Sequence, residues 1–126
     1  MVSWDYFVGF EREIPRKDLE AFLDRERYDL IEDDICPDND SEDINYESRE
    51  GGLVEIYVFT KPLKVKEGEV PDWKKSGLEI KSDIMVSTKD VSAIDEAERI
   101  TKELIKRYDG VFYDTNMDEF FRKDEL

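Results

Sequence analysis

The sequence predicts an α+β fold of the ferredoxin-like type, a two-layer sandwich in which two helices cover one face of a four-stranded antiparallel sheet. Two observations lead to this prediction. The stretch from Asp90 to Asp114 reads as a long amphipathic helix, a glycine and a short apolar strand, and the whole chain has the element order β-α-β-β-α-β. Two β-α-β crossovers of the usual right hand, with a hairpin between them, give this sandwich. With 126 residues, the chain is expected to form one domain, residues 1–126.

The first strand and the first helix are predicted near the N-terminus. Residues 2–10 alternate between the two faces of a strand. One face of this strand holds Trp4, Tyr6, Val8 and Phe10. Pro15 then opens a helix, because the first helical turn is the position that proline tolerates best. The inner side of this helix is expected to carry Leu19, Phe22 and Leu23.

An acidic insertion follows the first helix, over residues 29–50. It holds ten acidic residues and one basic residue, which gives a local charge of −9. Pro37, Asn39 and Ser41 are residues that interrupt regular structure. We therefore expect an irregular segment that is fixed at its two ends by its few apolar side chains.

The second and third strands are predicted over residues 53–60 and 78–87, where apolar residues alternate again. Between them lies a lysine-rich connector, residues 61–76, which is long for a hairpin loop. It holds five lysines and three acidic residues, a net charge of +2. The tail, residues 115–126, is expected to add a last helical turn.

The second helix carries the clearest pattern in the chain. Its apolar stripe consists of Val91, Ile94, Ala97, Ile100, Leu104 and Tyr108. Asp90 or Ser92 can cap its start, and Gly110 is expected to end it in a left-handed conformation. Residues 111–113 then form the fourth strand.

The net charge of −15, from 34 acidic and 19 basic residues, limits the partners that the protein can bind. A field of this sign repels the phosphates of nucleic acids and of anionic lipids, so neither is an expected partner. A basic protein surface fits it better, and the simplest alternative is that the charge serves solubility alone. The many charged residues and few amides are also typical of thermophile proteins.

The candidate partner-binding residues are the acids of the insertion and one aromatic anchor in the connector. They are Asp33, Asp34, Asp38, Asp40, Glu42, Asp43 and Trp73. The function predicted from them is that of a non-enzymatic, acidic macromolecule-binding or regulatory domain of the inhibitor, immunity or nucleic-acid-mimic type.

The sheet face away from the helices is predicted to carry Phe7, Tyr57, Phe59 and Met85, with Asp5, Glu55, Glu79 and Asp83 at the flanking positions. Such an aromatic surface is a liability when it is exposed. Either the chain covers it with Trp73 or with the Phe120–Phe121 tail, or a second copy packs on it. A homodimer through the open sheet face is therefore a second predicted partner.

The chain has few of the residues that enzymes use for catalysis. It contains no histidine, so the commonest general base near neutral pH is absent. Cys36 is the single cysteine and lies among carboxylates, which would weaken it as a nucleophile. A lone cysteine fits a reducing compartment, and no apolar run reaches the ~18 residues that span a membrane. We therefore expect a cytoplasmic protein.

A divalent-cation site is the alternative function. Asp114, Asn116, Asp118 and Glu125 match positions one, three, five and twelve of a calcium loop. Glu119 stands at position six, where the sharp turn requires glycine. Weak binding of Ca²⁺ or Mg²⁺ by residues 33–43 is also expected from their charge density. On this reading the protein is a cation-binding sensor or a carboxylate-based, metal-dependent enzyme.

Overall fold

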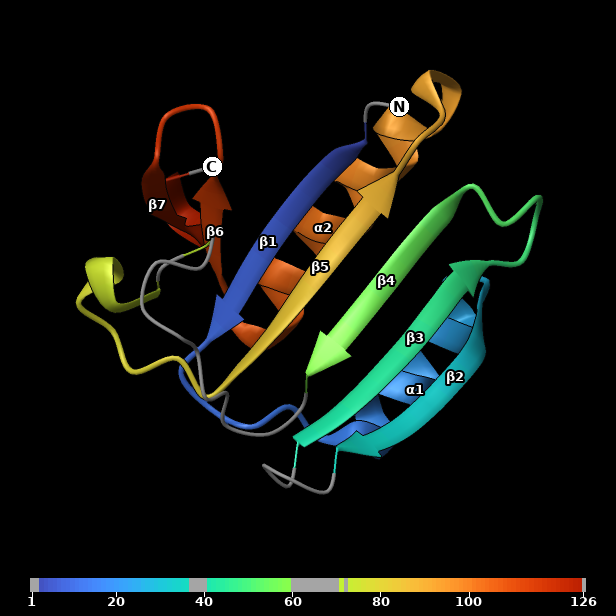
Figure 1. Ribbon diagram of the computed structural model, residues 1–126, viewed down its shortest axis with the longest axis horizontal. Coiled ribbons are helices and arrows are strands. Elements are labelled where there is room, and N and C mark those ends of the chain that lie inside the picture. The colour runs from blue at the N-terminus through green and yellow to red at the C-terminus, as the bar shows by residue number, and fades with distance from the viewer. Residues whose placement is uncertain (1–2, 37–40, 60–70, 72, 126) are drawn as a thin grey trace.

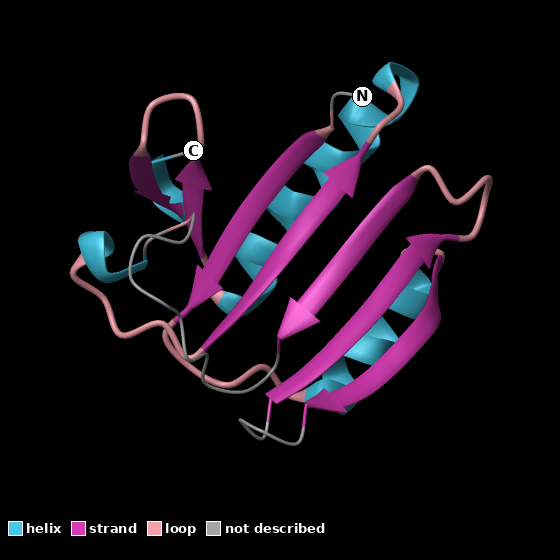
Figure 2. Cartoon of the chain, viewed as in Figure 1, coloured by secondary structure: helices cyan, strands magenta, loops and turns pink. Residues whose placement is uncertain are grey.

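The computed structural model of the chain describes residues 3–36, 41–59, 71 and 73–125, with the backbone alone for 32–36 and 41–43. These residues form a seven-stranded antiparallel sheet with two α-helices on one face (Figures 1 and 2). The strands are β1 (Trp4–Phe10), β2 (Tyr28–Cys36), β3 (Ser41–Ser48), β4 (Val54–Phe59), β5 (Ser82–Thr88), β6 (Val111–Asp114) and β7 (Glu119–Arg122). The helices are α1 (Arg16–Arg25) and α2 (Ile94–Tyr108). The order of the strands in the sheet is β2-β3-β4-β5-β1-β6-β7.

The four-stranded ferredoxin-like sandwich is therefore wrong, although the fold is α+β. The four strands that the sequence predicts are present as β1, β4, β5 and β6, and they are neighbours in the order β4-β5-β1-β6. Three further strands extend this sheet at both of its ends (Figure 1). At one end is the β2-β3 hairpin, and at the other is β7.

The β2-β3 hairpin is the acidic insertion, which was predicted to be irregular. Its pairing runs from Tyr28 opposite Ser48 to Cys36 opposite Ser41, with a bulge between Leu30 and Glu32. Alternation explains why a strand forms here, because Ile44 and Tyr46 point into the core and are fully buried. Burial of these two side chains outweighs the high acid content around them. At the other end of β3, positive φ angles at Gly51 and Gly52 make the turn into β4.

The tail forms a strand that was not predicted, ahead of its predicted helical turn. Residues 119–122 pair antiparallel with β6, from Asp114 opposite Glu119 to Val111 opposite Arg122. Only a short 3₁₀ turn, Lys123–Glu125, follows. The third predicted strand is also shorter at its start than expected, since β5 begins at Ser82.

The second helix is confirmed, and its two ends show how it is fixed. A short 3₁₀ turn, Val91–Ala93, leads into it, and the Asp90 carboxylate accepts a hydrogen bond from the Ser92 N–H at 2.9 Å. At the other end Asp109, not Gly110, has the left-handed conformation, with φ of 55°. Gly110 is required for packing instead, because a Cβ there would lie 2.6 Å from Cγ1 of Val8.

The core lies between the sheet and the two helices, with α1 behind the β2-β3 side and α2 behind β1 and β5 (Figure 1). The sheet contributes Val8, Phe10, Ile44, Ile56, Val58, Ile84 and Val86, and the helices contribute Leu19, Leu23, Ala97, Ile100 and Leu104. Asp18 of α1 ties the helices together, since its carboxylate accepts from Arg107 at 2.8 and 3.0 Å and from the Tyr108 hydroxyl at 2.7 Å. Both α-helices lie on this one side (Figure 1), which leaves much of the opposite face of the sheet for other contacts.

Candidate surface on the open sheet face

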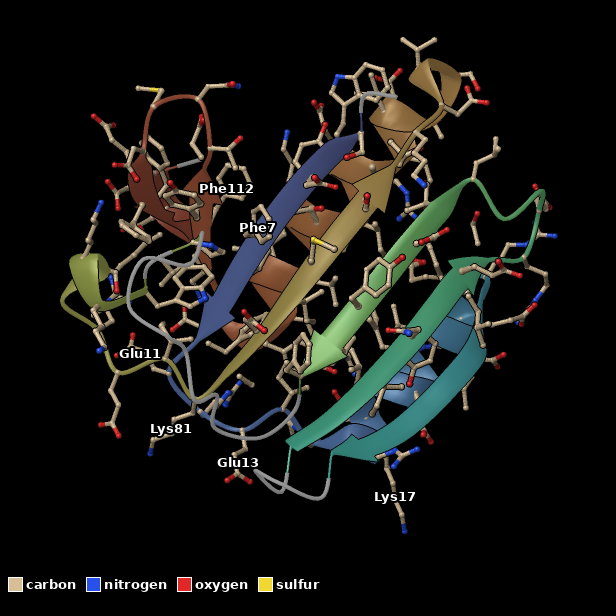
Figure 3. All side chains as sticks on the ribbon, viewed as in Figure 1. Phe7, Glu11, Glu13, Lys17, Lys81 and Phe112 are labelled. Atoms are coloured by element: carbon tan, nitrogen blue, oxygen red, sulfur yellow. The ribbon has the colours of Figure 1, made fainter. Side chains whose placement is uncertain are left out.

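The open face is the side of the sheet away from α1 and α2, and Figure 3 views it from the front with the helices behind. Its side chains form rows across the strands, because directly paired residues point to the same side. One such row crosses five strands and is mostly acidic. From β2 to β1 it consists of Asp29, Glu47, Glu55, Ser87 and Asp5. We refer to it as the acidic row.

Three carboxylates of the acidic row, those of Glu47, Glu55 and Asp5, have no basic partner among the residues that the structure describes. Asp29 does have one, since its Oδ1 is 2.9 Å from Nη2 of Arg49. Asp5 accepts from the hydroxyls of Ser3 at 3.1 Å and Ser87 at 2.6 Å, which solvate its charge without neutralising it. Three unneutralised acids in one row, with only Ser87 between Glu55 and Asp5, form a strongly negative stripe.

Glu47 and Glu55 are directly opposite each other in the pairing of β3 with β4. Glu55 accepts a hydrogen bond from the Tyr57 hydroxyl, while Glu47 is exposed. Like charges that face each other across a ladder destabilise it. The sheet therefore carries an electrostatic cost at this pair, which a cation bound on the face would reduce.

An apolar row runs beside the acidic row. It lies two residues away along each strand, a distance of about 7 Å. Its central members are Tyr57, Met85 and Phe7, which are paired in register and half-buried. Phe7 also meets the ring of Tyr113 edge-on, with centroids 6.4 Å apart. A hollow of about 320 Å³ opens where the two rows meet the β2-β3 hairpin. Its lining is Ile31, Asn45, Tyr46, Glu47, Glu55 and Tyr57.

Trp73, a predicted partner-binding residue, covers one end of the open face. It is 4% exposed and lies on Gly9 of β1, where a Cβ would be 3.0 Å from its ring. Its ring also contacts Tyr113 and Phe120, with centroids 6.3 and 5.7 Å away. Most of the surface of Trp73 is therefore buried against other residues of the same chain. Both segments that were expected to cover the face, the connector and the tail, contribute to this cluster.

Asp83 is held under Trp73. The indole Nε1 donates a hydrogen bond to its Oδ2 at 3.2 Å. Burial is the main cause that raises the pKa of this carboxyl to about 6, and the Trp73 hydrogen bond works in the opposite direction. Asp83 thus titrates nearer to neutral pH than an ordinary aspartate.

Four of the six predicted acids of the insertion lie in the β2-β3 hairpin. The register places Asp34 opposite Asp43, Ile35 opposite Glu42, and Asp33 opposite Ile44. Asp38 and Asp40 lie outside the described residues. The hairpin places the four described residues on a regular ladder at the edge of the sheet, four or more residues along the strands from Asp29 and Glu47 of the acidic row.

The predicted cation ligands of the tail lie around the β6-β7 turn. The Asp114 carboxylate accepts from the backbone N–H of Asn116 at 2.9 Å, and Asp118 accepts from the Tyr113 hydroxyl at 2.6 Å. Glu125 accepts from the backbone N–H of Arg122 at 3.0 Å. These carboxylates therefore stabilise the β6-β7 turn and the residues on either side of it. Within the described part of the chain, no three Asp, Glu, Cys or His side chains are grouped closely enough to hold a metal ion.

Sequence reasoning placed Asp5 and Glu55 on the open face but did not find the acidic row. Glu47 was missed because its strand was not expected. The alternation of Ile44, Tyr46 and Ser48 with Asn45 and Glu47 was the signal that could have revealed it.

Comparison with protein-family models, with curated proteins and with solved structures finds no match to this chain. In the part of the chain that the structure describes, no helix is both long and apolar enough to span a membrane.

Proposed function

We propose that the protein is a non-enzymatic, acidic domain that binds a basic, amphipathic segment of another protein on its open sheet face. The observation that carries the proposal is the acidic row, with Glu47, Glu55 and Asp5 unneutralised by any described residue. Neighbouring strands are about 4.8 Å apart, so Glu47 and Asp5 are about 14 Å from each other. Two lysines or arginines one turn apart on a helix, about 5.4 Å, match the step from Glu47 to Glu55, and a third about two turns further on lies near Asp5.

The apolar row explains why an amphipathic partner fits better than a simple polycation. Tyr57, Met85 and Phe7 are half-buried and lie beside the acids. Burying them under a partner adds an apolar contribution of about 25 cal/mol per Å². The ion pairs would set the orientation and the rate of association, while the apolar contact would supply most of the affinity.

A second copy of the chain is a poorer partner for this face. A two-fold dimer places the same patch of one copy against that of the other. Two acidic rows would then be desolvated in one interface without cations between them, which is costly. A homodimer through the open sheet face stays a prediction, but the row favours a basic partner over it.

The β2-β3 hairpin supports the same proposal from the edge of the sheet. Its candidate binding residues Asp33, Asp34, Asp38, Asp40, Glu42 and Asp43 extend the negative field beyond the acidic row. Such a field speeds up the encounter with a cationic partner and is screened by salt. A chain with a single cysteine is suited to a reducing compartment, and we propose that this binding takes place in the cytoplasm.

The proposal is tested by capture from a native lysate at 50 mM salt, followed by elution with a salt gradient. The wild-type protein is compared with the double variant Glu47→Gln, Glu55→Gln, which removes two charges from the acidic row. We expect proteins with basic segments to be retained by the wild type and to elute early, or not bind, with this variant.

The matched control is Asp95→Asn, Glu103→Gln, which removes two charges from α2 on the other side of the sheet. It should retain the same proteins as the wild type. If the two double variants elute alike, net charge alone governs binding and the open face has no special role. If nothing is retained at low salt, the proposal is wrong.

The alternative function, a divalent-cation sensor or a carboxylate-based enzyme, also stays a prediction. Its first ligands would be Asp114, Asn116, Asp118 and Glu125, and the three carboxylates among them already accept hydrogen bonds within the tail. Calorimetric titration with Ca²⁺ and Mg²⁺ separates the two functions. Heat of binding that disappears in Asp114→Asn would favour the alternative.

A further inference from the structure

The pairing of β6 with β1 does not reach the first residues of β1, and this leaves one side of residues 4–6 open. On its β5 side β1 is paired along its whole length, from Trp4 to Phe10. On its other side, β6 pairs only with Phe7, Val8 and Gly9. Among the described residues, no strand is paired with this side of residues 4–6. Alternate residues of such an edge present a free N–H and C=O.

The divergence of the chain at Asp114 explains the opening. If the pairing of Phe7 with Tyr113 continued, Asp114 would lie opposite Tyr6. Instead Asp114 accepts hydrogen bonds from the N–H groups of Asn116 and Met117, which start the turn to β7. The β6-β7 arm therefore leaves the edge of β1 at this point (Figure 1).

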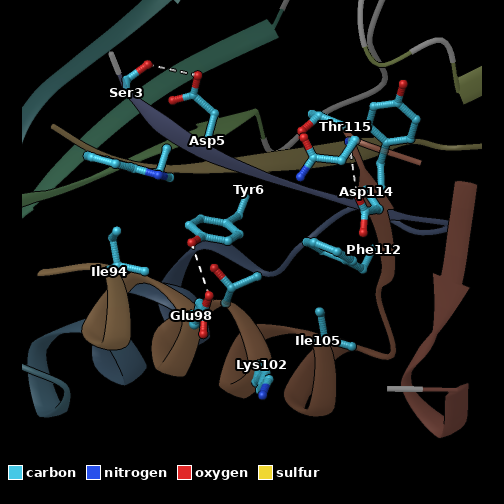
Figure 4. A pocket seen from close by; sticks show the side chains of 14 residues that line it. Ser3, Asp5, Tyr6, Ile94, Glu98, Lys102, Ile105, Phe112, Asp114 and Thr115 are labelled. Atoms are coloured by element: carbon cyan, nitrogen blue, oxygen red, sulfur yellow. Dashed lines mark hydrogen bonds between the residues drawn. The ribbon is translucent and has the colours of Figure 1, made fainter. Parts of the chain in front are cut away.

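A groove of about 780 Å³ lies at this opening, bounded by β1, the β6-β7 arm and α2 (Figure 4). This volume is within the range of about 300–1,000 Å³ that is usual for ligand sites. Tyr6 and Phe112 extend from the two strands toward α2, and both rings are half-buried. Ile94 and Ile105 of α2 add apolar surface to the groove. The groove thus combines a free strand edge with an apolar interior.

The charge in the groove is negative and incompletely balanced. Glu98 projects from α2 and accepts a hydrogen bond from the Tyr6 hydroxyl at 3.3 Å. Lys102, one helical turn further on, lines the same groove, yet the two side chains form no ion pair. Asp114 and Asp5 also border the groove, so three acids face one base. Glu98 lies next to the Tyr6 ring, with Phe112 in the same groove, and this suits a guanidinium, which pairs with carboxylates and stacks on rings.

From this geometry we infer that the groove binds an extended segment of another polypeptide, which pairs with residues 4–6 of β1 and places an arginine or lysine at Glu98. Three paired residues cover about 10 Å, so the bound segment is three to five residues long. This is strand addition to a sheet edge, in which backbone hydrogen bonds give affinity and side-chain pockets give selectivity.

The inference goes beyond the proposed function, because the groove lies on the far side of β1 from the β2-β3 hairpin. Its binding groups are Glu98 and the edge of residues 4–6, and it shares only Asp5 with the acidic row. A free cationic small molecule could contact Glu98 but would leave the strand edge unpaired. The acidic lining argues against a second copy of this chain, whose charge of −15 has the same sign.

The test is a ¹⁵N NMR titration of the full chain with a capped pentapeptide that has arginine at the centre, valine on either side and threonine at both ends. We expect shifts at the amides of residues 4–6 and 114–116. A peptide with glutamate at the centre should bind at least threefold more weakly. A peptide N-methylated at alternate residues should lose most binding, because methylation removes the N–H donors that pair with β1.

Variants of the protein complete the test. Glu98→Gln keeps an acceptor for Tyr6 but removes the charge, and it should weaken binding of the arginine peptide at least threefold. Glu103→Gln on the same helix lies outside the groove and should bind like the wild type, as should Glu47→Gln, Glu55→Gln. Absence of shifts at millimolar peptide, or equal binding by Glu98→Gln and Glu103→Gln, would overturn the inference. If the methylated peptide binds as tightly as the unmodified one, strand pairing plays no part and the groove binds only the cationic group.

Discussion

At the scale of single residues, Gly110 shows a constraint that comes from packing rather than from backbone conformation. A Cβ at this position would lie 2.6 Å from Val8 Cγ1 and 2.8 Å from Phe10 Cε1, and both neighbours are fully buried. Gly110→Ala should therefore destabilise the protein by about 1–3 kcal/mol through overpacking, as measured by urea unfolding.

A double-mutant cycle separates this steric cause from a backbone effect. Val8→Ala removes the methyl that the new Cβ would meet, so the double variant should lose less stability than the sum of the two single losses. Gly77→Ala is the contrasting change, because Gly77 has φ of +74° and open space around its Cβ position. Its cost should be about 1 kcal/mol, caused by left-handed strain alone. Strict additivity at residues 8 and 110 would contradict the steric explanation.

Asp83 gives a prediction about pH. Burial raises its pKa to about 6 from 3.8, so the folded state binds this proton more tightly than the unfolded state. Its contribution to stability therefore falls as pH rises from about 4 to about 6, and the full cost is present above pH 6. Asp83→Asn should be more stable than the wild type at pH 7, by at most about 3 kcal/mol.

Unfolding in urea at pH 4 and pH 7, followed by tryptophan fluorescence, checks this prediction. The advantage of Asp83→Asn should shrink strongly at pH 4, where the wild-type carboxyl is mostly protonated in the fold. A variant that is less stable than the wild type at pH 7 would show that the hydrogen bond from Trp73 to the carboxylate outweighs the cost of burying the charge.

At the scale of elements, Asp18 of α1 is the main polar tie to α2. Two hydrogen bonds from Arg107 and one from the Tyr108 hydroxyl lower the pKa of this carboxyl to about 2. Its stabilising contribution is therefore present above the unfolded pKa of 3.8 and is lost as pH falls through about 2. Asp18→Asn should lower the melting temperature by a few degrees at pH 7.

The control for this tie is Glu20→Gln, which breaks the pair of Glu20 with Arg16 one turn apart on the surface of α1. Exposed pairs of this kind contribute little, so its melting temperature should stay close to that of the wild type. Thermal unfolding by circular dichroism at pH 7 and at pH 2 measures both variants. Equal losses in the two variants would mean that the link between the helices has no special weight.

The elements that could be predicted from the sequence are those with a clear apolar period. The stripe from Ile94 to Tyr108 and the alternation in β1 have this property. The β2-β3 hairpin could not be recognised in the same way, because its core-facing residues Ile44 and Tyr46 are few among many acids. Their burial depends on α1 lying beneath them, which is a tertiary effect. Strand β7 was missed for a similar reason, because it forms by pairing with the edge that β6 offers.

The candidate site depended on those missed elements. Asp5 and Glu55 were assigned to the open face from alternation alone. Glu47 joins them only through the pairing of β3 with β4, and a pairing register is not visible in one sequence. The groove at residues 4–6 was missed for the opposite reason. The sequence shows where β6 begins, but not that it leaves β1 after three paired residues.

At the scale of the whole molecule, the excess of acids makes stability depend on salt. Even if all 19 basic residues were paired, 15 of the 34 acidic residues would keep an unbalanced charge. Repulsion among these charges opposes the compact state, and salt screens it over a Debye length of about 10 Å at 0.1 M. Salt also weakens the surface ion pairs, but pairs such as Arg27–Glu50 and Arg49–Asp24 are exposed and contribute little.

Screening of the net repulsion should therefore dominate, and the melting temperature should rise by about 5 °C between 20 and 500 mM NaCl, which corresponds to about 1 kcal/mol. Glu47→Lys places a cation between Asp29 and Glu55 in the acidic row. It should raise the melting temperature at low salt and reduce its dependence on salt, while it abolishes binding of a basic partner at the open face. Differential scanning calorimetry over the salt series measures the first two effects. A melting temperature that falls with salt would show that the ion pairs, and not the net charge, control the stability of this fold. If Glu47→Lys is stabilised and still binds the basic partner, the acidic row is not the binding site.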